Sequence, residues 1–184
     1  MITVRVGIAD HFGWAVAVTA APDFSVADRR RVELVEPDVT PAPIHYDSAR
    51  LDVAGTVALV ETVRASVARM TAASLDDLAA ALPQPVVSIS MRSWPDDFPT
   101  DIEVLRRTPW EARADAVMYR QILADLAQER GWAVHFYNAK DVISQATKIL
   151  GARADDVFDS PKIKLGPPWT KDHRVALAAA IVAS

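Results

Sequence analysis

Hydrophobic and polar residues alternate with the period of a β-strand through the first part of the chain. Residues 4–9 and 14–18 are short runs of mainly small and β-branched apolar residues, and the turn-forming residues 10–13 lie between them. Residues 27–35 alternate charged and apolar positions, which is typical of a strand at a sheet edge with one face in water. The pattern therefore predicts three strands that follow one another in a meander.

From residue 52 the apolar positions change to the spacing of a helix. Val60, Val63 and Val67 form one apolar stripe and predict a helix over residues 52–70. Ser74 has the character of a fresh N-cap, which predicts a second, short helix that ends at Pro83. Further along, the same reasoning predicts strands at 85–91 and 132–137, helices at 111–130, from 138 and at 171–182, and an irregular stretch at 153–170.

The predicted order of elements specifies an α/β fold. Three strands in a meander, followed by two further strands that alternate with helices, imply a mixed five-stranded sheet with helices on both faces. The first strand should lie in the centre, between the second and the fourth. No internal repeat or linker interrupts the pattern, so we expect residues 1–184 to form a single domain.

Composition narrows the classes of function. The net charge of −4 argues against a protein that simply coats nucleic acid, although basic residues gather around 92–120 and 162–174. These clusters predict either a local anion-binding face or ordinary solvated helix faces. The chain has no cysteine, which excludes disulfides and thiolate metal sites. It has no apolar run long enough to cross a membrane, and a strand pattern begins at residue 3, so we expect a cytoplasmic protein with no membrane partner.

Ionisable residues follow the predicted strands at the edge where open α/β sheets bind ligands. Asp10 follows the first strand, Asp97 lies in the loop after the fourth, and Asp172 begins the last helix. Three carboxylates that converge there could hold one or two Mg²⁺ ions and support in-line phosphodiester hydrolysis. The alternative is that Asp10 only forms a turn and that the other two are acids at helix starts, where the helix dipole favours them.

Basic residues at the same edge predict a site for an anionic ligand. Free backbone N–H groups at the start of the last helix favour an anion, and nearby cations strengthen such a site. Trp169 could form a wall of the crevice and stack on a ring, or it could serve as an ordinary residue between core and rim. The candidate ligand-binding residues are Arg92, Lys140, Lys171, Arg174 and Trp169.

Two short motifs resemble those of a known superfamily. Residues 6–13, Val-Gly-Ile-Ala-Asp-His-Phe-Gly, resemble a Gly-Ile-Asp-Pro-Gly motif on a first strand. Residues 172–178, Asp-His-Arg-Val-Ala-Leu-Ala, resemble an Asp-x-x-Asp-Ala-Leu-Ala motif at the start of a last helix. Together with the order of elements, they make the chain similar to the RNase H-like superfamily, nearest to the RuvC-type junction resolvases. The resemblance implies an RNase H-like fold and a Mg²⁺-dependent nuclease with a cluster of four acids.

The chain departs from that motif set at three positions. Ala9 stands where the resemblance implies the acid of the first strand, and Asp10 comes one residue later. A shift of one residue in a strand moves a side chain to the opposite face unless the residue already lies in the turn. The fourth strand offers only Ser88 and Ser90 in place of a carboxylate, and Val175 stands for the second acid of the last helix.

These observations support three hypotheses about function. The first is a Mg²⁺-dependent phosphodiesterase or nuclease, in which Asp10, Asp97 and Asp172 bind the metal and His173 positions water or the leaving group. The second is a catalytically degenerate module of the same fold that binds an anionic ligand, such as structured nucleic acid, through Arg92, Lys171 and Arg174. The third is an interaction subunit with a vestigial crevice, whose partner is a protein, including a second copy of the chain in a homodimer. The sequence leaves open whether the protein is an enzyme.

Overall fold

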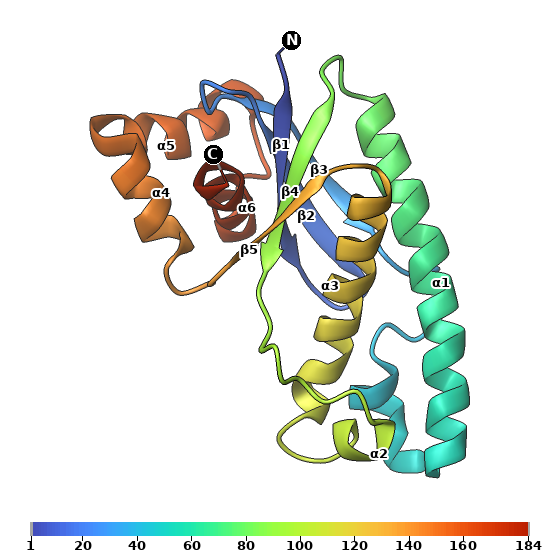
Figure 1. The fold of residues 1–184 in the computed structure, drawn as a ribbon. Helices are drawn as coiled ribbons and strands as arrows, with labels where there is room; N and C mark the ends of the chain where they lie inside the picture. Colours follow the sequence, from blue (N-terminus) through green and yellow to red (C-terminus); the bar gives the residue numbers. More distant parts are fainter. Residues whose placement is uncertain (1, 184) are drawn as a thin grey trace.

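A mixed five-stranded sheet forms the centre of the protein in the computed structural model, which describes residues 2–183 (Figure 1). The strand order is β3-β2-β1-β4-β5. β1 pairs antiparallel with β2 and parallel with β4, while β2 pairs antiparallel with β3 and β4 parallel with β5. The predicted sheet, with its first strand in the centre, is therefore confirmed. The strands are β1 (Val4–Asp10), β2 (Trp14–Ala20), β3 (Val26–Glu33), β4 (Val86–Arg92) and β5 (Ala133–Tyr137).

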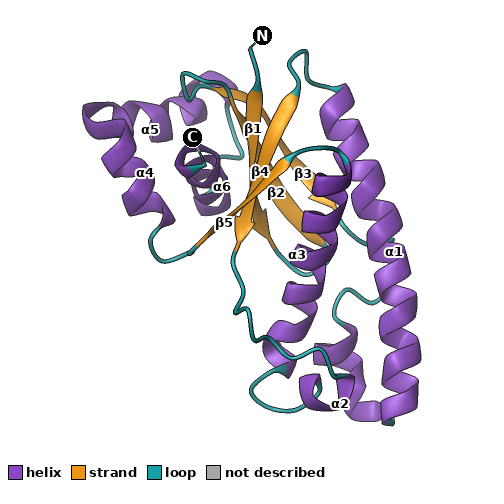
Figure 2. Cartoon of the chain, in the orientation of Figure 1, coloured by secondary structure: helices purple, strands orange, loops and turns teal. Residues whose placement is uncertain are grey.

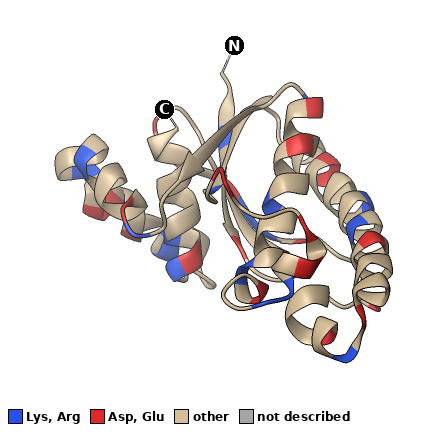
Figure 3. Ribbon diagram, turned by 60° about the horizontal axis from the view of Figure 1, so that its bottom comes forward, with Lys and Arg blue, Asp and Glu red and all other residues tan. Residues whose placement is uncertain are grey.

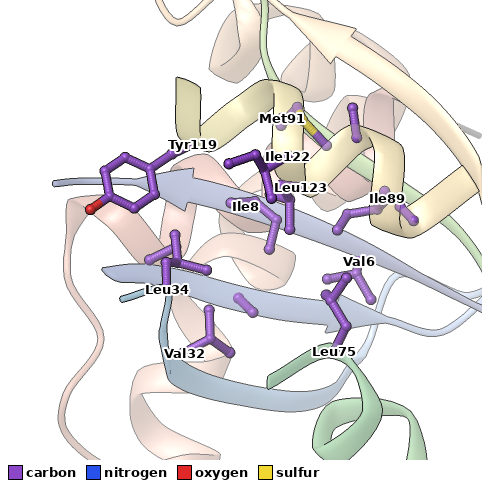
Figure 4. Close-up of a cluster of buried hydrophobic side chains, with 14 of the residues drawn as sticks. Val6, Ile8, Val32, Leu34, Leu75, Ile89, Met91, Tyr119, Ile122 and Leu123 are labelled. Atoms are coloured by element: carbon purple, nitrogen blue, oxygen red, sulfur yellow. The ribbon is translucent and has the colours of Figure 1, made fainter. Parts of the chain in front are cut away.

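Two long helices cover one face of the sheet. α1 (Val53–Ala80) and α3 (Glu111–Glu129) lie side by side there (Figure 1). Alternate residues of the strands point toward them, because successive side chains of a strand point to opposite faces. Figure 4 shows this core, in which strand residues such as Val6, Ile8 and Ile89 pack with Leu123 of α3.

Three helices cover the other face: α4 (Val142–Leu150), α5 (Ala154–Leu165) and α6 (Lys171–Val182) (Figure 2). α6 packs directly on β1 and β2. Gly7 makes this close approach possible, since a Cβ atom there would lie 1.8 Å from the carbonyl oxygen of Ala176. The small side chains of α6, among them Ala178, Ala179 and Ala180, are fully buried in this second core.

Three helical segments differ from the sequence-based expectation. α1 continues through residue 74 to Ala80, because the Ser74 hydroxyl donates to the carbonyl oxygen of Glu33 instead of capping a new helix. α5 occupies most of the stretch expected to be irregular, and Pro161 lies inside it. The short α2 (Ile102–Leu105) forms in the loop between β4 and α3. Short helical turns also lie at Pro43–Asp47, Ser48–Arg50 and Gly151–Arg153.

No helix in residues 2–183 is both long and apolar enough to span a membrane. α1 is the longest, and charged residues recur along it (Figure 3).

Candidate functional site

Asp10, the last residue of β1, belongs to the face of the sheet that α3 covers. Ile8 packs in the core beneath α1 and α3, whereas Ala9 packs in the core beneath α6. Because side chains alternate along a strand, Asp10 shares the face of Ile8. Its Oδ2 atom accepts a hydrogen bond of 2.8 Å from Nε of Arg120 on α3. The Arg120 and Asp10 side chains are only 9% and 3% exposed, so this is a buried ion pair.

The ion pair forms one wall of a cavity of about 400 Å³ at the end of β1 and β4. We call this cavity the arginine crevice and define it by Asp10, His11, Arg92, Arg113 and Arg120. Arg92 and Arg113 are exposed, and neither makes a salt bridge within residues 2–183. The Oδ1 atom of Asp10 is buried and has no hydrogen-bond partner among the described residues. The crevice thus combines a guanidinium group that Asp10 holds in place with two that make no salt bridge among residues 2–183, those of Arg92 and Arg113. The guanidinium of Arg113 also lies 5.8 Å from the ring centroid of Phe98.

Asp172 lies on the other side of the sheet, in the first turn of α6. Its Oδ2 atom lies 2.9 Å from Nε2 of His11, the residue that directly follows β1. The imidazole ring of His11 also stacks on the indole ring of Trp14, with centroids 4.1 Å apart and an angle of 11° between the planes. His11 therefore connects the arginine crevice, which it lines, with the start of α6.

The structure does not assemble the predicted magnesium cluster of Asp10, Asp97 and Asp172. Asp10 faces α3 and is neutralised by Arg120, while Asp172 belongs to α6 on the opposite face. Asp97 is exposed in the loop after β4. Residues 2–183 contain no group of three or more His, Asp or Glu side chains that could hold a metal ion. The donor set therefore does not fit Mg²⁺, and the physical reason is the position of the acid one residue later in β1.

His173 has a structural role at the start of α6. It is 6% exposed, and its Nδ1 atom accepts a hydrogen bond of 3.2 Å from the backbone N–H of Thr170. The Thr170 hydroxyl lies 2.9 Å from the same nitrogen. Burial lowers the pKa of His173, and the nearby positive charge of Arg29 acts in the same direction. Nδ1 of this residue is thus engaged at the start of the helix, while its role in positioning water or a leaving group stays a prediction.

The predicted anion-binding residues separate into different places. Lys171, Arg174 and Trp169 line a second pocket, between α5 and the start of α6. Arg174 lies 3.6 Å from a carboxylate oxygen of Asp159, and the Trp169 indole N–H donates to the carbonyl oxygen of Phe158. Arg92 belongs to the arginine crevice. Lys140 is exposed at the turn after β5 and lines neither pocket.

Arg113 and Arg120 belong to the basic cluster at residues 92–120 for which the sequence allowed an anion-binding face, but they were not among the candidate ligand-binding residues. Their spacing of seven residues places both on one side of α3, two turns apart. The seven-residue spacing could have shown that the two arginines lie on the same side of a helix. It does not show that this side lies beside the ends of β1 and β4.

Among the known proteins compared with the chain, similarity is found only to solved structures. No protein-family model matches the chain, and no curated protein matches it. One similar structure is that of Thermus thermophilus RuvC in complex with a Holliday junction substrate, at 12% identity and a TM-score of 0.49, covering 98% of this chain and 91% of that one. Another is a structure of Thermus thermophilus RuvC at 14% identity and a TM-score of 0.46, covering 97% and 92%.

Proposed function

We propose that the protein binds a phosphate-bearing ligand, a nucleic acid strand or a smaller phosphate ester, in the arginine crevice without the help of a metal ion. One observation carries this proposal: Arg92, Arg113 and Arg120 converge on one cavity, and Asp10 is the only acid among the described residues that line it. The crevice therefore presents an excess of positive charge in a protein whose net charge is −4.

The chemistry of the guanidinium group favours phosphate. Arginine presents its N–H groups as a planar fork that matches two phosphate oxygens, and such charge-assisted hydrogen bonds are stronger than neutral ones. Asp10 fixes Nε of Arg120 through the buried ion pair, so this side chain loses less freedom when a ligand binds. Among residues 2–183, neither Arg92 nor Arg113 has a salt bridge that must break before it contacts the ligand.

The distribution of charge indicates a local contact rather than a long electrostatic track. Basic and acidic residues are interspersed along the ribbon (Figure 3). A ligand held by three arginines displaces few counterions, so its affinity for a single-stranded oligonucleotide should fall with salt at a slope of only about 2 on logarithmic axes.

Fluorescence anisotropy with a labelled oligonucleotide tests the proposal, and inorganic phosphate and a nucleoside monophosphate serve as competitors. We expect Arg113→Ala and Arg92→Ala each to weaken binding about tenfold, since one charge-assisted contact contributes roughly 1.5 kcal/mol. Addition of EDTA should leave the affinity unchanged. Equal competition by all phosphate compounds would indicate a small phosphate ester, whereas preference for the oligonucleotide would indicate a nucleic acid.

Arg64→Ala provides the matched control. Arg64 is also an exposed arginine without a salt bridge among the described residues, but it lies on α1 at a different cavity. Its replacement should not change the affinity. Absence of binding to every probe at low salt, or equal binding by Arg113→Ala and the unchanged protein, would contradict the proposal and leave the interaction subunit.

A further inference from the structure

His11 and Asp172 have the arrangement of a general base and the carboxylate that orients it. Nε2 of His11 lies 2.9 Å from Oδ2 of Asp172, and the two side chains are 41% and 37% exposed. Both groups are therefore within reach of solvent, unlike the buried pair of Asp10 and Arg120. His11 is also the only member of this pair that lines the arginine crevice.

The imidazole ring of His11 is held from two directions. Asp172 fixes it at its edge, and Trp14 fixes its plane by stacking at 4.1 Å. The guanidinium of Arg31 in turn lies 3.9 Å from the ring centroid of Trp14, which secures the indole. An imidazole with two such contacts has few orientations available, and this is a requirement for efficient proton transfer.

The contact with Asp172 also determines which nitrogen is free in the neutral ring. A carboxylate can only accept a hydrogen bond, so Nε2 of His11 carries the proton and donates it to Asp172. Nδ1 then holds the lone pair, and no hydrogen bond to it is found within residues 2–183. In its neutral form, His11 thus offers the lone pair of Nδ1 beside a cavity lined by three arginines.

We propose that the protein hydrolyses phosphodiesters without a metal ion, with His11 as the general base and Asp172 as its positioning residue. This inference rests on the proposed function, because the arginine crevice must hold the phosphate. A water molecule attacks phosphorus and forms a P–O bond while its proton passes to Nδ1 of His11. The P–O bond to the leaving group breaks, the electron pair departs with the leaving oxygen, and the imidazolium later releases its proton to solvent.

The arginines provide the charge stabilisation that this reaction needs. Negative charge increases on the phosphoryl oxygens and on the leaving oxygen in the transition state, where positioned donors are most effective. Arg120 is held before the ligand arrives, and neither Arg92 nor Arg113 makes a salt bridge within the described residues. The base and the charge stabilisation therefore come from side chains of this chain alone.

Hydrolysis of bis(para-nitrophenyl) phosphate in the presence of EDTA tests the proposal, because its leaving group departs without protonation. We expect a slow turnover that His11→Gln reduces about a hundredfold, within the usual range for loss of a general base. Asp172→Asn should lower kcat with little change in KM, since the substrate contacts remain but the ring loses its orientation. Added imidazole should restore part of the activity of His11→Gly.

His135→Gln is the matched control, because His135 is an exposed histidine on β5 outside the crevice, and its activity should be unchanged. Binding by the unchanged protein without any hydrolysis would overturn this inference and leave the proposed function intact. Hydrolysis that His11→Gln retains, or that EDTA abolishes, would also overturn it. Failure of binding itself would remove the proposed function.

Discussion

The position of a single residue in β1 decides the chemistry of the crevice. Asp10 comes one place after Ala9, so it faces α3 and meets Arg120, while Ala9 packs beneath α6. The alternation of a strand made this change of face predictable from the sequence. The partner was not predictable, because Arg120 lies 110 residues away and only the packing of α3 on the sheet brings it to Asp10. The sequence therefore indicated that the metal motif was displaced but not what replaced it.

Asp115, a buried acid on α3, predicts that the stability of the protein depends on pH. Asp115 is 1% exposed, and its oxygens accept the backbone N–H groups of Ile44 and His45. Burial raises its pKa from 3.8 to about 6. Between these values the folded protein keeps a proton that the unfolded chain has released, so this residue's contribution to stability decreases as the pH rises through the interval. The contribution is complete below about pH 4 and absent above about pH 6.

We therefore expect Asp115→Asn to flatten the change in stability between pH 4 and pH 7 by up to about 3 kcal/mol, the equivalent of about two pKa units. Urea unfolding of both proteins at several pH values measures this change. Asp125→Asn, at an exposed position on the same helix, should keep the pH dependence of the unchanged protein. Parallel curves for the unchanged protein and Asp115→Asn would show that Asp115 does not titrate in this interval.

At the scale of elements, the contact between β1 and α6 depends on the absence of a side chain at Gly7. A Cβ atom there would lie 1.8 Å from Ala176 O and 2.9 Å from Ala180 N, both of which are backbone atoms. We expect Gly7→Ala to displace α6 and to lower the free energy of unfolding by at least about 2 kcal/mol, as overpacked cores do. Chemical denaturation followed by circular dichroism measures the loss.

Gly131→Ala is the comparison for that experiment. Gly131 has a φ of +75°, but a Cβ atom there would have no neighbour within 4 Å. We expect Gly131→Ala to lower the free energy of unfolding by only about 1 kcal/mol, the usual cost of a left-handed backbone for a residue with a side chain. Equal losses for the two variants would mean that α6 does not require the close approach.

The helices show which local signals were sufficient and which were not. The apolar stripes of α1 and α3 predicted helices, because their periodicity reflects burial on the sheet. The extent of α1 was wrong because Ser74 uses its hydroxyl for a distant carbonyl group, that of Glu33. α5 was missed because a proline inside a helix normally disfavours it, and its packing in the second core is a tertiary effect.

At the scale of the whole molecule, the order of strands was predictable and the composition of the site was not. The succession of elements allows few arrangements of the sheet, so its mixed topology with a central β1 could be derived. The arginine crevice, in contrast, draws its residues from the end of β1, the end of β4 and one side of α3. Such a juxtaposition depends on helix packing, which no local pattern specifies.

The packing of α6 on the sheet predicts that the protein cannot fold without this helix. This helix packs on β1 and β2 and buries eight residues, His173 among them. We expect residues 1–170 alone to give a poorly dispersed NMR spectrum, because one face of the sheet loses its cover. Addition of a peptide of residues 167–184 should restore dispersion. A well-dispersed spectrum of residues 1–170 by themselves would contradict this prediction.

The dependence of β1 on α6 also has a consequence for synthesis on the ribosome. α6 begins at residue 171 and β1 ends at residue 10, so 160 residues (171 − 10 − 1) separate them in the order of translation. Translation at about 5–20 residues per second takes roughly 8–32 seconds to cover this distance, so β1 leaves the ribosome that long before α6 is synthesised. During this interval the nascent chain exposes the alanine-lined and valine-lined face of its sheet, which is a surface that chaperones recognise. Synonymous codon changes that slow translation of the second half of the chain should therefore decrease the soluble yield, while the stability of the finished protein stays the same.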